Sequence, residues 1–164
     1  MSMNDLKDVY VDQLQDLHSA CSQSAKITAE LAEKATDEAL VKALKAGVSG
    51  IEDGMATLRA LIEGHGADPG GEHCKGMEGL VREARAHALE ESFGADAVRD
   101  AMIVTQYQRM AHYALAGYGC LVAFAGRLGL DDEAKKLTEC LDATYGGDRH
   151  MTEIATSGLN AAAA

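Results

Sequence analysis

The chain has 164 residues, with 15 Lys and Arg against 26 Asp and Glu, which gives a formal net charge of −11 with histidine neutral. This acidic balance argues against binding to nucleic acid or to an anionic membrane surface, because long-range repulsion opposes the encounter. Hydrophobic residues make up 47% of the chain and Trp is absent, so a globular protein is expected and an all-β fold is excluded. The length predicts a single domain over residues 1–164.

The location expected from the sequence is the cytoplasm. No stretch approaches the roughly 18 apolar residues of a membrane span, and the charged stretch 1–8 lacks the apolar region of a signal peptide. The cysteines are widely separated, without a CxxC pair, and are expected to be free thiols. They are Cys21, Cys74, Cys120 and Cys140.

Hydrophobic spacing predicts two long helices in the first part of the chain. Apolar or small residues recur every three or four positions over residues 6–35, which indicates one face of a helix. Thr36 or Asp37 is then placed to cap a second helix, whose apolar line continues to Ile62. The glycine-rich segment 64–71 breaks this pattern and predicts a loop.

Three further helices follow from the same spacing. They are predicted over residues 74–91, 95–128 and 134–155. Gly129 suits the left-handed residue that ends a helix, and Asp131 or Asp132 is placed to cap the next one. Residues 160–164 are expected to fray. The predicted fold is all-α: an antiparallel bundle of four long helices. The short helix over residues 74–91 is an addition that lies, in chain order, between the second long helix and the one over residues 95–128.

Three residues stand out on the apolar faces of these helices. Asp148 shares a helical line with Leu141 and Met151, where a carboxylate needs a partner. Two interpretations stay open: Asp148 pairs with an Arg, His or Tyr of another helix, or it is a metal ligand or a binding-site acid. Cys21 is expected to pack as a small apolar thiol, and His112 to be a hydrogen-bonded histidine near the core.

Glycines inside the predicted helices need an explanation, since each destabilises a helix interior by about 1 kcal/mol relative to Ala. They are Gly47, Gly50, Gly54, Gly146 and Gly147. They indicate either close approach of neighbouring helices or space for a larger group. The tyrosines expected to fill such space are Tyr107, Tyr113, Tyr118 and Tyr145. An unfilled cavity is the alternative.

Metal-ligand spacing is weak in this sequence. A di-iron carboxylate bundle takes Glu-x-x-His from two of its helices, and no Glu of the chain has a His three residues later. Glu83 and His87 are four residues apart and are expected to face solvent. His65, His73 and Cys74 flank the glycine-rich loop, where the histidines are expected to be solvated.

Several segments, spread from about residue 5 to residue 160, match a family pattern in order and spacing. They are Asp8-Val9-Tyr10 through His18-Ser19-Ala20, Ala35-Thr36-Asp37-Glu38-Ala39-Leu40, Cys74-Lys75-Gly76-Met77-Glu78-Gly79-Leu80, Arg99-Asp100-Ala101, His112-Tyr113 with Ala116-Gly117-Tyr118-Gly119, and Leu128-Gly129-Leu130. In these segments the chain resembles the YciE/YciF-like family of ferritin-like bacterial stress-response proteins. The resemblance implies a ferritin-like bundle, often dimeric, with a dinuclear metal centre and an association with osmotic and oxidative stress.

The sequence departs from that pattern where the resemblance implies metal ligands. Glutamates are expected at the positions of Cys21, Ala111, Ala114, Ala143 and Thr144, and a Glu with a Gln or His at those of Ser49 and Glu52. Asp148 persists, and Glu52 supplies a carboxylate one turn from the usual place. Hard metal ions need several oxygen or imidazole ligands, so we expect no di-metal centre and no cofactor.

Three functional hypotheses stay open. The first is a non-catalytic protein that acts as a homodimer or by binding an unidentified protein partner. The second is an enzyme that keeps catalysis at a single zinc or iron ion, held by Glu52, His112 and Asp148, with or without Cys21. The third is a small-ligand binder that uses the space left by small residues: Ser49, Ala111, Ala114 and Gly147.

Overall fold

The computed structural model describes residues 3–164, so Met1 and Ser2 of the N-terminal stretch lie outside the described residues. Helices and loops account for this whole range, which confirms the all-α fold. The long helices are α1 (Leu6–Lys34), α2 (Glu38–Gly64), α4 (Asp96–Arg127) and α5 (Asp131–Ile154). The shorter elements are α3 (Lys75–Ala84), the π-helical turns η1 (Arg85–Glu90) and η2 (Ala155–Leu159), and α6 (Asn160–Ala162).

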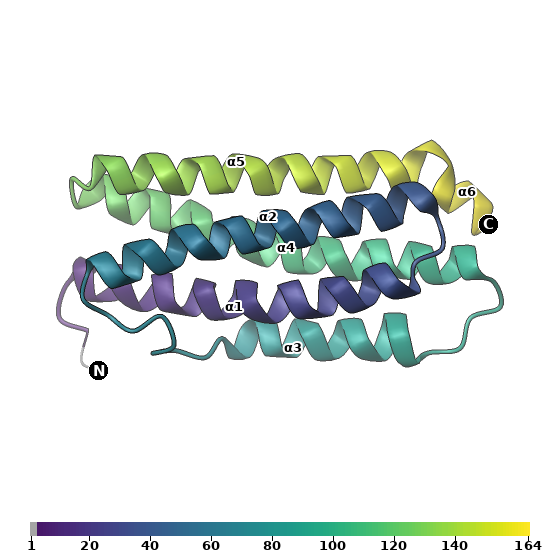
Figure 1. The fold of residues 1–164 in the computed structure, drawn as a ribbon, viewed down its shortest axis with the longest axis horizontal. Helices are drawn as coiled ribbons and strands as arrows, with labels where there is room; N and C mark the ends of the chain where they lie inside the picture. Colours follow the sequence, from purple (N-terminus) through teal and green to yellow (C-terminus); the bar gives the residue numbers. More distant parts are fainter. Residues whose placement is uncertain (1–2) are drawn as a thin grey trace.

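The long helices lie side by side and run in alternating directions (Figure 1). α1 packs against α2 and α4, and α5 packs against the same two helices, so the four enclose a common interior. The short α3 packs against α1 and α4. Among the described residues no helix has both the length and the hydropathy needed to cross a membrane.

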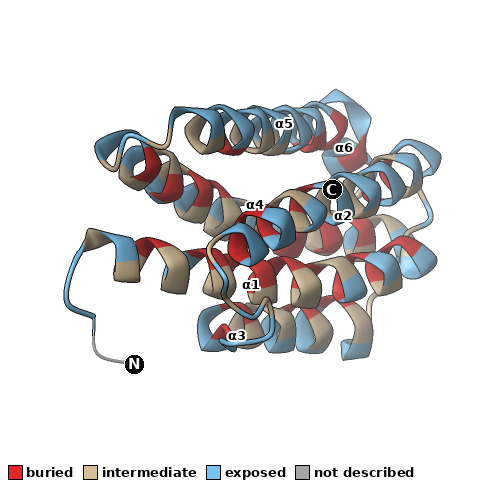
Figure 2. Ribbon diagram, turned by 60° about the vertical axis from the view of Figure 1, so that its left-hand side comes forward, coloured by how far each residue is buried: buried red, intermediate tan, exposed pale blue. Residues whose placement is uncertain are grey.

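The interior faces of the helices carry the apolar residues that the spacing predicted (Figure 2). The largest side chains with less than 2% exposure include Tyr10, Leu14, Leu31, Leu44, Leu58, Ile62, Ile103, Leu121 and Leu137. Burial of such faces is the main source of helix stability in a protein of this kind, since isolated helices are marginal in water.

The helix ends agree with the sequence in two places and differ in one. The Asp37 carboxylate accepts a hydrogen bond from the Leu40 backbone N–H at 2.9 Å and caps α2. Gly129 has φ +72° and ends α4. A cap on α5 from Asp131 or Asp132 was expected, but neither side chain caps this helix. The helix begins at Asp131 itself, because the Leu130 N–H already bonds to Ala125 of α4 at 2.9 Å, and the acidic residues occupy the positive first turn.

The C-terminal tail is more ordered than the sequence predicted. Residues 160–162, expected to fray, form α6, and Leu159 just before them is 6% exposed. Both η2 and α6 pack against α4. Leu159 therefore anchors the end of the chain to the core, which a tail rich in alanine did not suggest.

A buried carboxylate ties the α1–α2 turn to α4. Asp100 is 1% exposed and accepts hydrogen bonds from the Thr36 backbone N–H at 3.0 Å, the Thr36 hydroxyl at 2.8 Å and the Asp37 N–H at 2.8 Å. The three donors satisfy this acid without a metal or a basic side chain. It fixes where α2 starts relative to α4, and α2 forms one wall of the site described next.

Candidate functional site

A pocket of about 700 Å³ lies inside the ring of long helices. Apart from Gly54 of α2, its buried lining residues come from α1 and α4. Its exposed lining residues come from α2 and α5, so the pocket opens between α2 and α5. The buried lining residues are Cys21, Ser24, Thr28, Gly54, Tyr107, Met110 and Tyr118. The small residues of the predicted helices thus correspond to a real space rather than only to tight helix packing.

Two of the helical glycines of α2 are explained by tyrosines that fill part of the interior. A Cβ built on Gly47 would come within 2.8 Å of the Tyr107 hydroxyl, and one on Gly54 within 2.5 Å of the Tyr118 hydroxyl. Gly50 lies between them and has nothing within 4 Å of its Cβ position. Close approach therefore explains the outer two positions, and open pocket explains the middle one.

The other expected tyrosine contacts differ. Tyr113 packs instead against Gly76 of α3, and its hydroxyl lies 3.0 Å from the Cys74 thiol. Tyr145 is 42% exposed and fills no interior space, which contradicts the expectation. Gly146 faces open space, again with nothing within 4 Å. Both residues lie outside the pocket lining, to which α5 contributes Thr144 and Gly147. Each step of one residue along a helix turns the side chain by about 100°, so the two positions between them point elsewhere.

The polar groups inside the pocket are neutral hydroxyls and thiols. The Cys21 sulfur lies 3.9 Å from the Tyr118 hydroxyl, and burial raises the pKa of this thiol to about 12. Burial also raises the pKa of Tyr118 and of Tyr107, the latter with a further contribution from the charge of Asp148. These groups are protonated at neutral pH, so the interior offers hydrogen bonds without charge.

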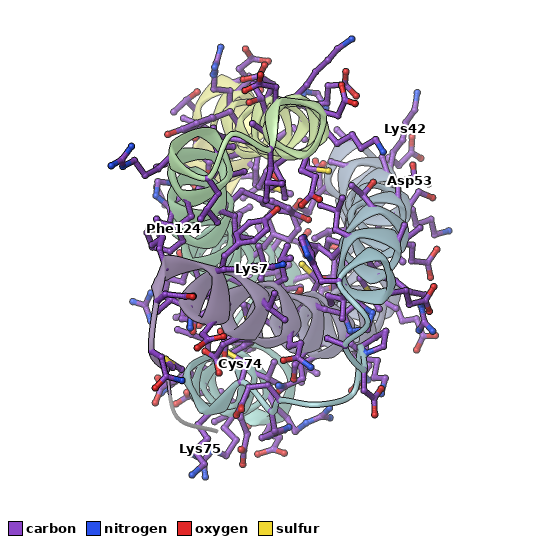
Figure 3. All side chains as sticks on the ribbon, turned by 90° about the vertical axis from the view of Figure 1, so that its left-hand side faces the viewer. Lys7, Lys42, Asp53, Cys74, Lys75 and Phe124 are labelled. Carbon is purple, nitrogen blue, oxygen red and sulfur yellow. The ribbon has the colours of Figure 1, made fainter. Side chains whose placement is uncertain are left out.

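Charged residues stand at the mouth of the pocket, where they remain exposed. They are Lys42 and Asp53 on α2 and Lys136 and Glu139 on α5, and the imidazole of His150 also lies at the mouth. Figure 3, which looks along the helices, places the labelled Lys42 and Asp53 on the α2 side. Both signs of charge occur at the mouth, so the field there does not select strongly for one sign of ligand.

The structure brings only part of the sequence-predicted site together. Cys21, Ala111, Ala114, Ala143 and Thr144 all line the pocket. On α2, by contrast, Ser49 and Glu52 are exposed and lie outside the lining, whereas their neighbours Gly50 and Asp53 contribute to it. The assignment of site positions on α2 is therefore displaced by one residue.

Asp148 and His112 form a pair at the surface of α4 and α5 rather than a core site. The Asp148 carboxylate is 3.2 Å from His112 Nε2 and accepts a hydrogen bond from the Gln108 amide at 3.1 Å. The Asp148 side chain is 15% exposed and that of His112 is 64% exposed. Asp148 thus has the partner from another helix that one interpretation required, and His112 does not lie near the core as expected.

The remaining metal-ligand candidates lie apart from one another. His65 pairs with Glu133 at 3.1 Å, His73 with Glu78 at 2.9 Å, and the exposed His87 with Glu83 at 3.4 Å. Cys74 caps α3, away from the pocket (Figure 3). Across residues 3–164 no group of three or more His, Cys, Asp or Glu side chains converges as a metal ion requires.

The donor set of the pocket does not fit a pair of hard metal ions. Its buried lining offers hydroxyls, thiols and methyl groups, and its carboxylates, Asp53 and Glu139, are exposed at the mouth. Iron or manganese in such a site needs several converging carboxylates or imidazoles. Glu52, His112 and Asp148, the candidates for a single ion, are not gathered into one group either.

Sequence reasoning overlooked one residue of this site. Thr28 is 0% exposed, lines the pocket, and has a hydroxyl with no hydrogen-bond partner in the described part of the chain. Its position on the predicted apolar face of the first helix was visible in the sequence. The available signal was a polar group on an apolar line, the same signal that drew attention to Asp148.

The helices and pocket define an all-helical protein with a neutral interior cavity, and comparison with known proteins supplies the family. A family model described as a domain of unknown function, DUF892, matches residues 5–164. The chain belongs to this YciF-like family. Protein YciF of Escherichia coli is 30% identical over 161 residues, which cover 98% of this chain and 96% of YciF.

Solved structures agree with this assignment. The crystal structure of the E. coli stress protein YciF matches with a TM-score of 0.88 and 30% identity, covering 96% of this chain and 99% of that one. The structure of YcfI from Rhodopseudomonas palustris matches with a TM-score of 0.86 and 28% identity, covering 92% and 95% of the two chains. The fold is therefore shared over almost the full length of both relatives.

Proposed function

We propose that this chain is a ferritin-like, non-catalytic binding protein in which the di-metal centre of the family pattern has been lost and its space serves as a ligand pocket. One observation carries the proposal. Cys21, Ala111, Ala114, Ala143 and Thr144 stand where the resemblance expects glutamates, and all of them line the same pocket. Removal of the acids and opening of the space thus occur at one place.

The chemistry of the interior supports loss of the metal and of catalysis together. A cluster of buried acids without its ions would repel itself strongly, so ions and acids are expected to be lost together. The one buried thiol there, Cys21, has a pKa raised to about 12 and is not available as a nucleophile at neutral pH. Asp53 and Glu139 lie exposed at the mouth of the pocket, where solvent screens their charge.

The family relationship extends the proposal to a cellular role. The E. coli relative is described as a stress protein, and we carry that association to this chain. The four cysteines are free, as is usual in a reducing compartment, which supports a cytoplasmic location. Under stress the protein would then act by binding a ligand in the pocket rather than by turning over a substrate.

Elemental analysis of the native protein tests the loss of the metal centre. We expect far less than one equivalent of iron, manganese or zinc per chain, and a melting temperature unchanged by adding these ions. The Cys120→Ser variant serves as a control, because an exposed thiol can hold adventitious zinc. Stoichiometric metal that persists in this control and disappears in Asp148→Ala would contradict the proposal.

We also propose that the protein is a homodimer, as the resemblance implies. Light scattering at micromolar concentration is expected to report twice the chain mass of 17.3 kDa. A mass of one chain under these conditions would contradict the dimer without affecting the proposal on the metal centre. The two parts of the proposal therefore stand or fall separately.

A further inference from the structure

We propose that the pocket binds an uncharged, largely apolar ring molecule with one hydroxyl or carbonyl group, and that this group hydrogen-bonds to the Thr28 side chain. The inference rests on the proposed function, since an interior occupied by metal ions would have no room for such a ligand. It names the class of ligand and the residue that recognises it.

Thr28 supplies the observation that points to a ligand. Its side chain is fully buried and lines the pocket, yet its hydroxyl has no hydrogen-bond partner in residues 3–164. Buried hydroxyls are almost always paired, because an unpaired one loses its bonds to water without compensation. A bound molecule is the natural source of the missing partner.

Other helical threonines of this chain make a local hydrogen bond that Thr28 does not make. They donate to the backbone carbonyl four residues earlier, at distances from 2.8 to 3.3 Å. They are Thr57, Thr105, Thr138, Thr144, Thr152 and Thr156. This local bond is open to a threonine in any helix. The Thr28 hydroxyl makes no such bond, although Thr28 is among the residues that line the pocket.

The polar groups of the pocket interior are uncharged, which favours an uncharged ligand. The nearby polar groups are the hydroxyls of Tyr107 and Tyr118 and the thiol of Cys21, all protonated at neutral pH. An ion taken into this space would lose its hydration and find no opposite charge. The charges at the mouth, Lys42 and Asp53 among them, remain in solvent.

The walls and the size of the pocket select a ring system. Alanines and glycines of α2, α4 and α5 make up much of the wall, together with the side chains of Ile51 and Met110 and the rings of Tyr107 and Tyr118. A volume of about 700 Å³ lies within the usual range for small-molecule sites. Gly50 and Gly147 are exposed at the opening between α2 and α5, so a flat molecule can enter there.

Two probes of nearly equal shape test the role of Thr28. They are 2-naphthol and 2-methylnaphthalene, which differ by a hydroxyl in place of a methyl group and are both uncharged at pH 7. The chain contains no Trp, so the fluorescence of each probe can be followed by excitation at wavelengths longer than those that the five tyrosines absorb. We expect wild-type protein to bind 2-naphthol about tenfold more tightly, the contribution of one hydrogen bond to a buried group.

The Thr28→Val variant keeps the shape of the side chain and removes its hydroxyl. We expect it to bind the two probes equally, with the affinity for 2-methylnaphthalene unchanged or improved. Retention of the tenfold preference in this variant would overturn the assignment of Thr28. Absence of 2-naphthol binding to the wild type, or equally tight binding of the anion 2-naphthalenesulfonate, would overturn the class of ligand.

A matched pair of glycine substitutions tests the location. Gly50→Leu places a side chain in the pocket and is expected to lower the affinity for both probes at least tenfold. Gly146→Leu makes the same change on α5 outside the lining and is expected to leave binding unchanged. If Gly50→Leu instead halves the mass measured by light scattering, a second copy of the chain covers the opening and the inference is overturned. Metal content, measured separately, decides the proposed function.

Discussion

The hydroxyl of Tyr118 on α4 lies over Gly54 on α2 so closely that a Cβ at position 54 would come within 2.5 Å of it. Tyr118 is 3% exposed, so the ring has little freedom to move aside. The packing of α2 against Tyr118 therefore requires a residue without a side chain at position 54.

Gly54→Ala is expected to lower the free energy of unfolding by about 1–2 kcal/mol, because the steric cost exceeds the gain in helix propensity. Gly50→Ala is its control on the same helix, since nothing lies within 4 Å of that Cβ position. At position 50 the gain in helix propensity, up to about 1 kcal/mol, should raise the free energy of unfolding because no steric cost opposes it. Urea denaturation measures both changes, and changes of equal sign would contradict the packing described.

Asp100→Ala is expected to lower the free energy of unfolding by about 2–4 kcal/mol, because it leaves the donors of Thr36 and Asp37 without their acceptor. Asp96→Ala on the same helix removes a carboxylate that pairs with Arg99 at the surface. Its cost should stay below about 1 kcal/mol. Similar losses in the two variants would mean that the buried network contributes nothing beyond a surface charge.

Tyr10→Phe is expected to cost about 1–2 kcal/mol of stability. The fully buried tyrosine donates a hydrogen bond to the Glu133 carboxylate at 2.7 Å, and bonds to charged groups contribute more than neutral ones. Tyr145→Phe, at an exposed tyrosine, should change stability by less than about 0.5 kcal/mol. Thermal and urea unfolding of the pair check this, and an unaltered Tyr10→Phe would contradict it.

Stability is expected to fall as the pH rises above about 9. The pKa of Cys21 is raised from 9.0 to about 12 by burial, so the folded state retains a proton that the unfolded state releases. The stabilisation is fully present below pH 9 and is lost progressively as the pH approaches 12. Raised pKa values of the buried Tyr10 and Tyr118 add to the loss above pH 10.

The Cys21→Ala variant isolates the part due to the thiol. Under reducing conditions, its free energy of unfolding should fall less between pH 8 and pH 10.5 than that of the wild type. At pH 8 a thiol reagent should modify the exposed Cys120 readily and the buried Cys21 only on unfolding. Rapid labelling of Cys21 in the folded protein would contradict both the burial and the pKa shift.

Part of the fold could be predicted from the order of residues alone. A spacing of three and four fixes which residues of a helix share a face, so the long helices and their apolar sides were predicted within a few residues. Asp37 and Gly129 mark helix ends through local backbone bonds and dihedral angles. The departures from the family pattern also singled out Cys21, Ala111 and Ala114, which line the pocket.

Helix rotation and packing across helices decided the rest. A step of one residue turns a side chain by about 100°, so Ser49 and Glu52 face solvent while Gly50 and Asp53 reach the pocket. Between the buried Leu44 and Leu58, glycines make up part of the inner face of α2, and they carry no side chain that would mark these positions as pocket lining in the sequence. The partner of Asp100, the free hydroxyl of Thr28 and the pocket itself each depend on where three or four helices meet, and such meetings are set by packing between distant segments rather than by local spacing.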